Sequence, residues 1–175
     1  SGTHHPPRAQ LARMRPGRIG RAGRRQTLET QRGRRQPGQD VPPLPPAVEI
    51  VRDASKGRGP LEGLAAGLRR ITSLGADAAY ASSTDVPFLQ PSFVCRMIDL
   101  LGDRAIAVPR VADRHHPLAA VYRVTVLPVI QILLVQDRLR PFFLFEAVPT
   151  RLVEASELLD ADPEFATLRN LNTPE

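Results

Sequence analysis

The sequence feature that most constrains the fold is the stretch AAYASSTDVP at residues 78–87. A short apolar run ends here in small hydroxyl residues, one carboxylate and a proline, which is typical of a buried strand that opens into a loop. In an open α/β sheet, ligands bind in the crevice beyond the carboxyl ends of the strands. Mg²⁺ needs one or two carboxylates there together with substrate phosphates, so Asp85 is the candidate ligand. An Asp before Val-Pro also begins turns and caps helices, and the spacing alone favours that simpler role.

Apolar periodicity along the chain predicts strands that alternate with helices. We expect strands at 48–51, 78–82, 105–109, 117–123 and 165–168, and helices at 61–74, 91–101 and 125–135. Residues 139–147 fit either element. This alternation predicts an α/β fold with three layers, in which a Rossmann-like, mostly parallel sheet is covered by helices on both faces.

Basic charge is concentrated in the first fifth of the chain. Residues 1–36 hold ten of the 24 Lys and Arg and only one of the 18 Asp and Glu, so this segment carries +9 and the remainder −3. The segment has no apolar periodicity and cannot bury enough surface to offset its ordering entropy, so we predict a disordered Arg-rich arm. The sequence PGQDVPPLPP at 37–46 predicts a stiff linker. We expect residues 47–175 to form the α/β domain.

Composition restricts the compartment and the partners. The single cysteine, Cys95, excludes an internal disulfide and fits a reducing compartment. No apolar run has the length of a bilayer-spanning helix, so we expect no membrane partner. Together with the reducing compartment, this favours the cytoplasm. We also expect a monomer. The arm lacks the aromatic residues that stack on bases, so charge alone supports nucleic acid as a partner and we do not expect one.

Four pieces of sequence occur together in a particular order. They are Asp53 followed by GPLEG at 59–63, STDVP at 83–87, HPLAAVYR at 116–123 and NLNTPE at 170–175. Together they resemble the molybdenum cofactor guanylyltransferases, which belong to the nucleotidyltransferases of the sugar-nucleotide type. Each piece alone is weak, but four in this order over roughly residues 37–175 are fairly specific. The last two pieces favour the guanylyl branch over the cytidylyl and sugar-phosphate branches.

The resemblance implies a fold of the nucleotide-diphospho-sugar transferase type, truncated at its N-terminus. It also implies a reaction in which the molybdopterin phosphate attacks the α-phosphate of GTP and releases pyrophosphate, with Mg²⁺ as cofactor. Asp85 matches the catalytic, Mg²⁺-binding aspartate. The other positions that it implies are Asp53 as the acidic contact to the nucleotide, Gly59, Pro60 and Leu61 beside the guanine and ribose, and Asn170 and Asn172 near the pterin substrate.

The N-terminus departs from this family. The family opens with a buried strand and a Gly-rich loop that cradles the triphosphate with backbone amides and a lysine. Here LARMRPG at 11–17 has no Gly-Gly pair, and no lysine precedes Lys56. We hypothesise that residues 1–36 are a shifted reading frame of a GC-rich gene or follow a wrongly assigned start, and we expect weak or no GTP turnover. If neither other frame of the same nucleotides encodes a Gly-rich loop that joins at Pro37, this hypothesis is wrong.

Other functions and simpler roles remain open. The chain could be a cytidylyl or sugar-phosphate transferase, or a non-catalytic α/β binding module whose basic arm contacts an acidic partner. Asp53 is otherwise a loop carboxylate, and the two asparagines are turn residues before Thr-Pro. Lys56 and Arg58 could hold phosphate or lie in a solvated loop. The adjacent residues His115 and His116 have no evident third ligand, so we expect them to be solvated.

Overall fold

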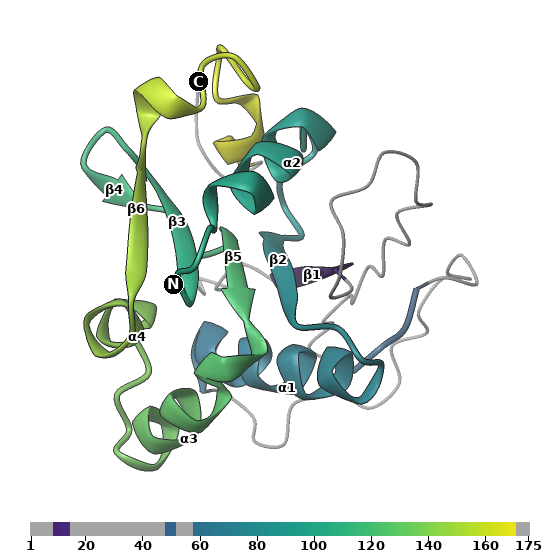
Figure 1. The fold of residues 1–175 in the computed structure, drawn as a ribbon, viewed down its shortest axis with the longest axis vertical. Helices are drawn as coiled ribbons and strands as arrows, with labels where there is room; N and C mark the ends of the chain where they lie inside the picture. Colours follow the sequence, from purple (N-terminus) through teal and green to yellow (C-terminus); the bar gives the residue numbers. More distant parts are fainter. Residues whose placement is uncertain (1–8, 15–47, 52–57, 171–175) are drawn as a thin grey trace, which may run out of the picture.

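A mixed sheet with helices on both faces makes up the part of the chain that the computed structural model describes, residues 9–14, 48–51 and 58–170 (Figure 1). The strands are β1 (Ala9–Met14), β2 (Ala78–Ser83), β3 (Ile106–Val111), β4 (Arg114–His115), β5 (Ala119–Arg123) and β6 (Thr150–Glu154). The helices are α1 (Gly59–Ser73), α2 (Pro91–Leu100), α3 (Leu127–Val135) and α4 (Pro141–Ala147). Three short 3₁₀ helices are η1 (Val124–Val126), η2 (Ala155–Glu157) and η3 (Ala166–Leu168).

Strand direction in the sheet differs from the expected mostly parallel arrangement. The order is β1-β2-β5-β3, and β3 also pairs with β4 and β6. Strand β5 lies antiparallel between β2 and β3, and among the strands of the described residues only the β3–β6 pair is parallel. The α/β class with helical layers on both faces is confirmed, but the sheet is mixed. Strands β2, β3 and β6 share one direction, so their carboxyl ends lie at the same edge of the sheet.

Two apolar cores lie on the two faces of the sheet, and β2 contributes to both. Ala79 and Ala81 pack in the core beneath α1, α3 and α4. Ala78 and Tyr80 pack in the core beneath α2. Side chains of a strand point alternately to opposite faces, so a strand that is buried throughout divides its residues in this way. The small alanines leave room for a helical layer on either side.

The predicted helices are confirmed, and their ends follow the local sequence. Proline lies in the first turn of each of the four α-helices, where no backbone donor is lost. Gly75 ends α1 with φ +74°, a left-handed conformation that a residue without a Cβ adopts at little cost. The ambiguous residues 139–147 contain α4.

One strand lies within the arm that we expected to be disordered. Ala9–Met14 forms β1 and pairs antiparallel with all of β2, with Ala9 opposite Ser83 and Met14 opposite Ala78. This strand depends on backbone pairing with β2, because its sequence carries no alternating apolar pattern. The other residues of the arm and the linker at 37–46 lie outside the described residues, so the proposed division of the chain stays a prediction.

Two other expected strands are absent from the described residues 48–51 and 165–168. Residues 48–51 have no regular structure, and the Glu49 carboxylate accepts a hydrogen bond of 2.7 Å from Nε of Arg70 on α1. A β-branched run becomes a strand only where it finds a partner strand, and this run lies beside a helix instead. Residues Phe165–Leu168 contain η3, in which backbone amides bond to a carboxylate rather than to a neighbouring strand.

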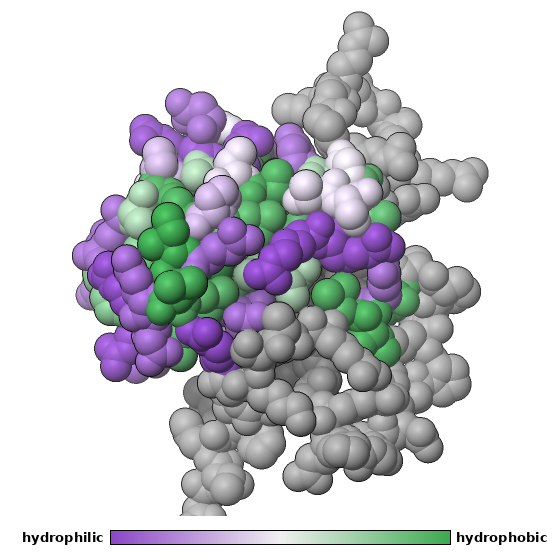
Figure 2. Space-filling view, turned by 90° about the horizontal axis from the view of Figure 1, so that it is seen from below, coloured by the Kyte–Doolittle hydropathy of each residue, from purple (hydrophilic) through white to green (hydrophobic). Residues whose placement is uncertain are grey.

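The face seen in Figure 2 mixes apolar and polar side chains. The exposed apolar residues on α3 and α4 are Ile132, Val135 and Phe142. Exposed apolar side chains of this kind are ordinary on soluble proteins and do not by themselves mark a site. None of the helices in the described ranges is long and apolar enough to cross a bilayer.

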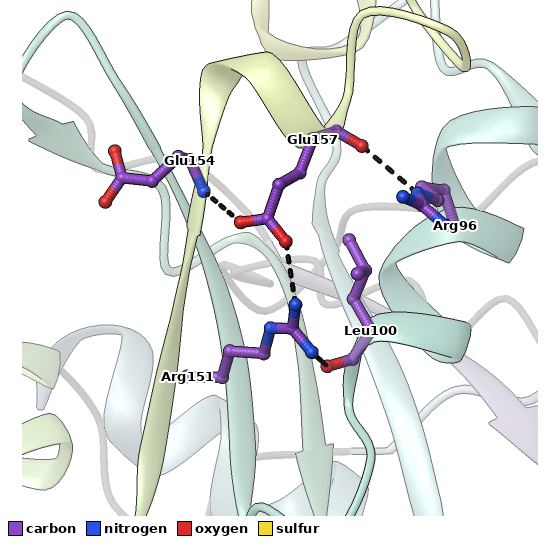
Figure 3. A network of polar contacts seen from close by, with 5 residues as sticks. All are labelled: Arg96, Leu100, Arg151, Glu154 and Glu157. Carbon is purple, nitrogen blue, oxygen red and sulfur yellow. Dashed lines mark hydrogen bonds and ion pairs between the residues drawn. The ribbon is translucent and has the colours of Figure 1, made fainter.

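A polar network fixes β6 and η2 against α2 (Figure 3). The Arg151 guanidinium donates to Oε1 of Glu157 at 2.7 Å and to the carbonyl of Leu100, the last residue of α2, at 3.1 Å. The other carboxylate oxygen of Glu157 accepts from the backbone N–H of Glu154 at 3.0 Å, and Arg96 donates to the Glu157 carbonyl at 3.1 Å. The Glu154 backbone N–H and the Arg151 guanidinium lower the pKa of Glu157 below its usual 4.5.

This network predicts that Glu157→Gln destabilises the fold. The amide loses the charge-assisted bond to Arg151, so we expect a loss of about 1 kcal/mol at neutral pH, which lowers Tm by about 2–4 °C. A carboxylate with a lowered pKa stabilises the fold above pH 4.5 and loses that contribution as the pH falls through its folded-state value. Thermal melts of the variant therefore depend less on pH below 4.5 than melts of the wild type do.

Glu164→Gln is the matched control. Its carboxylate is 78% exposed and lies 3.6 Å from Arg169, so we expect almost no change in Tm. Equal effects of the two substitutions would contradict the role given to Glu157.

Candidate functional site

The turn after β2 holds the candidate metal ligand. Ser82 and Ser83 are buried at the end of the strand, and Asp85 is half-buried in the turn that follows. The Ser83 hydroxyl donates a hydrogen bond to Oδ1 of Asp85, and the Ser83 backbone N–H donates to the carbonyl of Leu118 at 3.0 Å. The carboxylate is therefore held by a residue whose own position is fixed by the neighbouring strand segment.

The edge of the sheet at this turn also carries an ion pair. Arg110 and Glu154 lie opposite each other at the ends of β3 and β6. Their contacts are bidentate, at 2.9 Å from Nη2 to Oε1 and 3.3 Å from Nε to Oε2. Because Arg110 is engaged by Glu154, its charge is largely compensated within the sheet.

The oxygen donors around Asp85 suit a hard cation. The Asp85 carboxylate and the Ser83 hydroxyl bonded to it are oxygen ligands of the type that Mg²⁺ prefers. Within the described ranges, no group of three or more His, Cys, Asp or Glu is arranged to hold a metal ion. A cation at Asp85 would therefore take most of its remaining ligands from substrate phosphates and water.

The start of α1 is half-buried at Gly59 and Pro60, whereas Leu61 is fully buried in the core. A ligand beside this turn could meet the backbone of the first two residues, and Leu61 would support the turn from beneath. Gly59 has φ +68°, a conformation that other residues adopt only with strain.

Arg58 contacts α3 in the structure. This contact favours neither phosphate binding nor a solvated loop, the two roles expected from the sequence. Its guanidinium donates to the carbonyl of Leu134 and lies 3.6 Å from Asp137. These groups are at the carboxyl end of α3, where the partial negative charge of the helix dipole attracts a cation. Arg58 therefore caps a helix, and its availability to a phosphate is reduced.

The remaining sequence-predicted positions are only partly described. Asn170 is half-buried and follows η3. Asp53, Lys56 and Asn172 lie outside the described residues, so their proposed roles stay predictions.

A hollow of about 360 Å³ lies between β4 and α4. Its lining is aromatic and basic, with His115 centred 6.3 Å from the Phe142 ring and 6.0 Å from the Phe145 ring. The residues that line it are Arg114, His115, Pro117, Arg140, Pro141, Phe142 and Phe145. The sequence indicated a solvated His115 and missed this cluster, because the contacts join two segments that are distant along the chain.

His116 is half-buried rather than solvated. Burial lowers its pKa below 6.5, and the positive charge of Arg114 acts in the same direction, while a hydrogen bond to the backbone of Val111 opposes them. The imidazole is therefore neutral at pH 7.

Comparison with known proteins decides the family. The sequence model of the MobA-like NTP transferase domain matches residues 30–150. The chain belongs to this family. The match covers the start of α1, the Asp85 turn and the β3–β5 region, so these parts of the described site lie within the family domain.

Relatives and solved structures agree with this assignment. A probable molybdenum cofactor guanylyltransferase of Methanosarcina mazei is 34% identical over 132 residues, which cover 73% of this chain and 57% of the relative. The molybdenum cofactor guanylyltransferase of Rhodobacter capsulatus is 33% identical over 141 residues, covering 79% and 64% respectively. The chain thus spans less than two thirds of these relatives.

The crystal structure of molybdopterin-guanine dinucleotide biosynthesis protein A from Archaeoglobus fulgidus shares the fold. Its TM-score is 0.63 at 22% identity, over 72% of this chain and 63% of that one. The fold of the transferase family is therefore present in the described residues.

The site geometry makes a prediction for His116. The lowered pKa means that, below pH 6.5, the unfolded chain binds more protons than the folded chain, so the free energy of unfolding falls as the pH falls through 6.5. We expect an NMR titration of the His116 ring to show a midpoint below 6.5. His116→Gln should reduce the slope of stability against pH in this range. A midpoint at or above 6.5 would show that the ring is not desolvated.

Proposed function

We propose that this chain transfers GMP from GTP to molybdopterin at the Asp85 edge of the sheet, with release of pyrophosphate and with weak turnover. The observation that supports the proposal is a carboxylate held by Ser83 at the carboxyl end of β2, in a member of the MobA-like NTP transferase family. The names of the relatives favour the guanylyl branch. In α/β folds this edge is where nucleotides bind.

The reaction requires positioning and charge neutralisation more than covalent participation by the protein. Asp85 would bind Mg²⁺, which supplies neutralisation of the phosphate charge when it is bound. The half-buried backbone of Gly59 and Pro60 would lie beside the base and ribose, with Leu61 as support. Asp53 would contact the nucleotide, and the paired asparagines Asn170 and Asn172 the pterin.

Weak turnover is proposed because, in the part of the chain that the structure describes, few basic groups are available to a triphosphate at Asp85. Lys56 is the one lysine of the sequence. Among the described residues, Arg58 is engaged with the end of α3 and Arg110 with Glu154. Charge neutralisation at the α-phosphate would then depend mainly on the cation at Asp85.

We also propose that the enzyme is a monomer and that it acts in the cytoplasm. A single cysteine fits a reducing compartment. GTP and molybdopterin are the proposed partners, and neither a membrane nor a nucleic acid is included.

A direct test measures pyrophosphate release by the full chain with GTP, molybdopterin and Mg²⁺. We expect slow release that requires all three, and a loss of about 100-fold or more on Asp85→Ala, because the variant lacks the anionic ligand of the cation. Asp103→Asn is the matched control, since Asp103 is 93% exposed in the loop after α2 and should have no effect.

Two outcomes would contradict the proposal. Equal activity of the Asp85→Ala and Asp103→Asn variants would remove Asp85 from the site. Faster release with CTP than with GTP would assign the chain to a cytidylyl branch instead.

A further inference from the structure

Asp162 is a buried carboxylate that organises the segment before Asn170. It is 3% exposed, and its two oxygens accept hydrogen bonds from the backbone N–H groups of Ala166 at 2.9 Å and Thr167 at 2.8 Å. These amides belong to the short helix η3. Because a 3₁₀ helix of this length has little stability of its own, the carboxylate determines where η3 forms.

The backbone before η3 needs this support. Phe165 has φ +50°, in the left-handed region that residues with a side chain rarely adopt. Its amide donates to the carbonyl of Asp162 at 3.1 Å, and its side chain packs with Leu168 against the core beneath α2. Phe165 is therefore fixed by its own bond to the Asp162 carbonyl and by its apolar packing. The bonds of the next two residues to the Asp162 carboxylate hold the chain that follows it.

Thr167 connects this segment to the Asp85 loop. Its side chain is 1% exposed, and its hydroxyl oxygen accepts a hydrogen bond of 3.0 Å from the backbone N–H of Gln90. A second bond joins the same two regions, from the Ser92 hydroxyl to the carbonyl of Ala161 at 2.6 Å. The connection thus runs from the residues that follow Asp85 to the residues that precede Asn170.

The hydroxyl of Tyr80 on β2 lies within the electrostatic reach of Asp162. It is buried and has no hydrogen-bond partner among the described residues. Burial and the negative charge of Asp162 raise the pKa of Tyr80, so the phenol stays protonated.

We propose that Asp162 and Thr167 are positioning residues that couple the loop at 84–90 to the segment entering Asn170. Asp162 fixes η3 through two backbone hydrogen bonds, and Thr167 on η3 then fixes Gln90 by accepting its backbone N–H. The inference rests on the proposed function, in which a nucleotide at Asp85 must meet an acceptor near Asn170. Neither residue touches substrate, because both side chains are buried.

Thr167→Val and Thr167→Ser form a matched pair for the test. Valine keeps the shape of the side chain but cannot accept the Gln90 bond, whereas serine keeps the hydroxyl. Amide hydrogen exchange of the full chain should show the Gln90 amide exchanging about five-fold faster in the valine variant, with a rate near that of the wild type in the serine variant. Asp162→Asn, which keeps one acceptor oxygen, should speed exchange at Thr167 and at Gln90.

The kinetic readout separates positioning from general destabilisation. In the transfer assay, the valine variant should show a several-fold higher KM for molybdopterin and a lower kcat, with the KM for GTP within two-fold of the wild type. A purely structural role would lower only the amount of active protein and leave both KM values unchanged. The serine variant should restore the wild-type values.

The outcomes distinguish the two proposals. Unchanged exchange at Gln90 in the valine variant would overturn the coupling. Faster exchange with unaltered transfer kinetics would overturn the positioning role. If the wild type transfers no GMP at all, the proposed function fails, and the exchange measurements alone decide whether Asp162 and Thr167 couple the two segments.

Discussion

The structure depends on the burial of β2 on both faces and along both edges. All six residues of the strand are buried, and it pairs with β1 on one side and with β5 on the other. Alanines provide the small volumes that let helical layers pack on both faces, and Tyr80 fills the side beneath α2. A one-residue shift in register would move Tyr80 to the face that Ala79 and Ala81 fill and would leave alanine in its place beneath α2, so the packing on both faces would be lost. The carboxyl end of β2 therefore gives the Asp85 turn a defined position.

Strand pairing and local hydrogen bonds fix the elements near that turn. The Ser83 hydroxyl binds the carboxylate of Asp85, and the Ser83 backbone is bonded to the segment that enters β5. Arg110 and Glu154 join the ends of β3 and β6 at the same edge. Strand pairing places Arg110 opposite Glu154 and fixes the backbone of Ser83, whereas the Ser83–Asp85 bond forms locally within the turn. The membership of the chain in the MobA-like NTP transferase family gives this edge a proposed use.

Local sequence predicted the elements that depend on local physics. Apolar periodicity with proline in the first turn located α1, α2 and α3, and an unbroken apolar run located β2. Elements that depend on distant partners were not predictable in this way. Strand β1 exists through its pairing with β2, whereas residues 48–51 pair with no strand of the described ranges and bond to α1 through Glu49. The antiparallel direction of β5 likewise follows from how the chain returns between β2 and β3.

The candidate site shows the same division. Asp85 could be proposed from the residues around it, because a strand that opens into a hydroxyl-rich turn has a local signature. The connection between Thr167 and Gln90 could not, because it joins segments more than sixty residues apart in sequence. For Arg58 the sequence left phosphate binding and a solvated loop open, and its contact with the end of α3 was not predictable for a similar reason.

The central claim is that a cation and a nucleotide bind together at the end of β2, and paramagnetic NMR tests it most directly. Mn²⁺ can replace Mg²⁺ as a hard cation with oxygen ligands. Added with GTP to the full chain, it should broaden the backbone signals of Ser83, Thr84 and Asp85 first, and the signals should return on chelation. The signal of Asp103 should be unaffected. Broadening that is centred elsewhere, or that persists unchanged in the Asp85→Ala variant, would contradict the account.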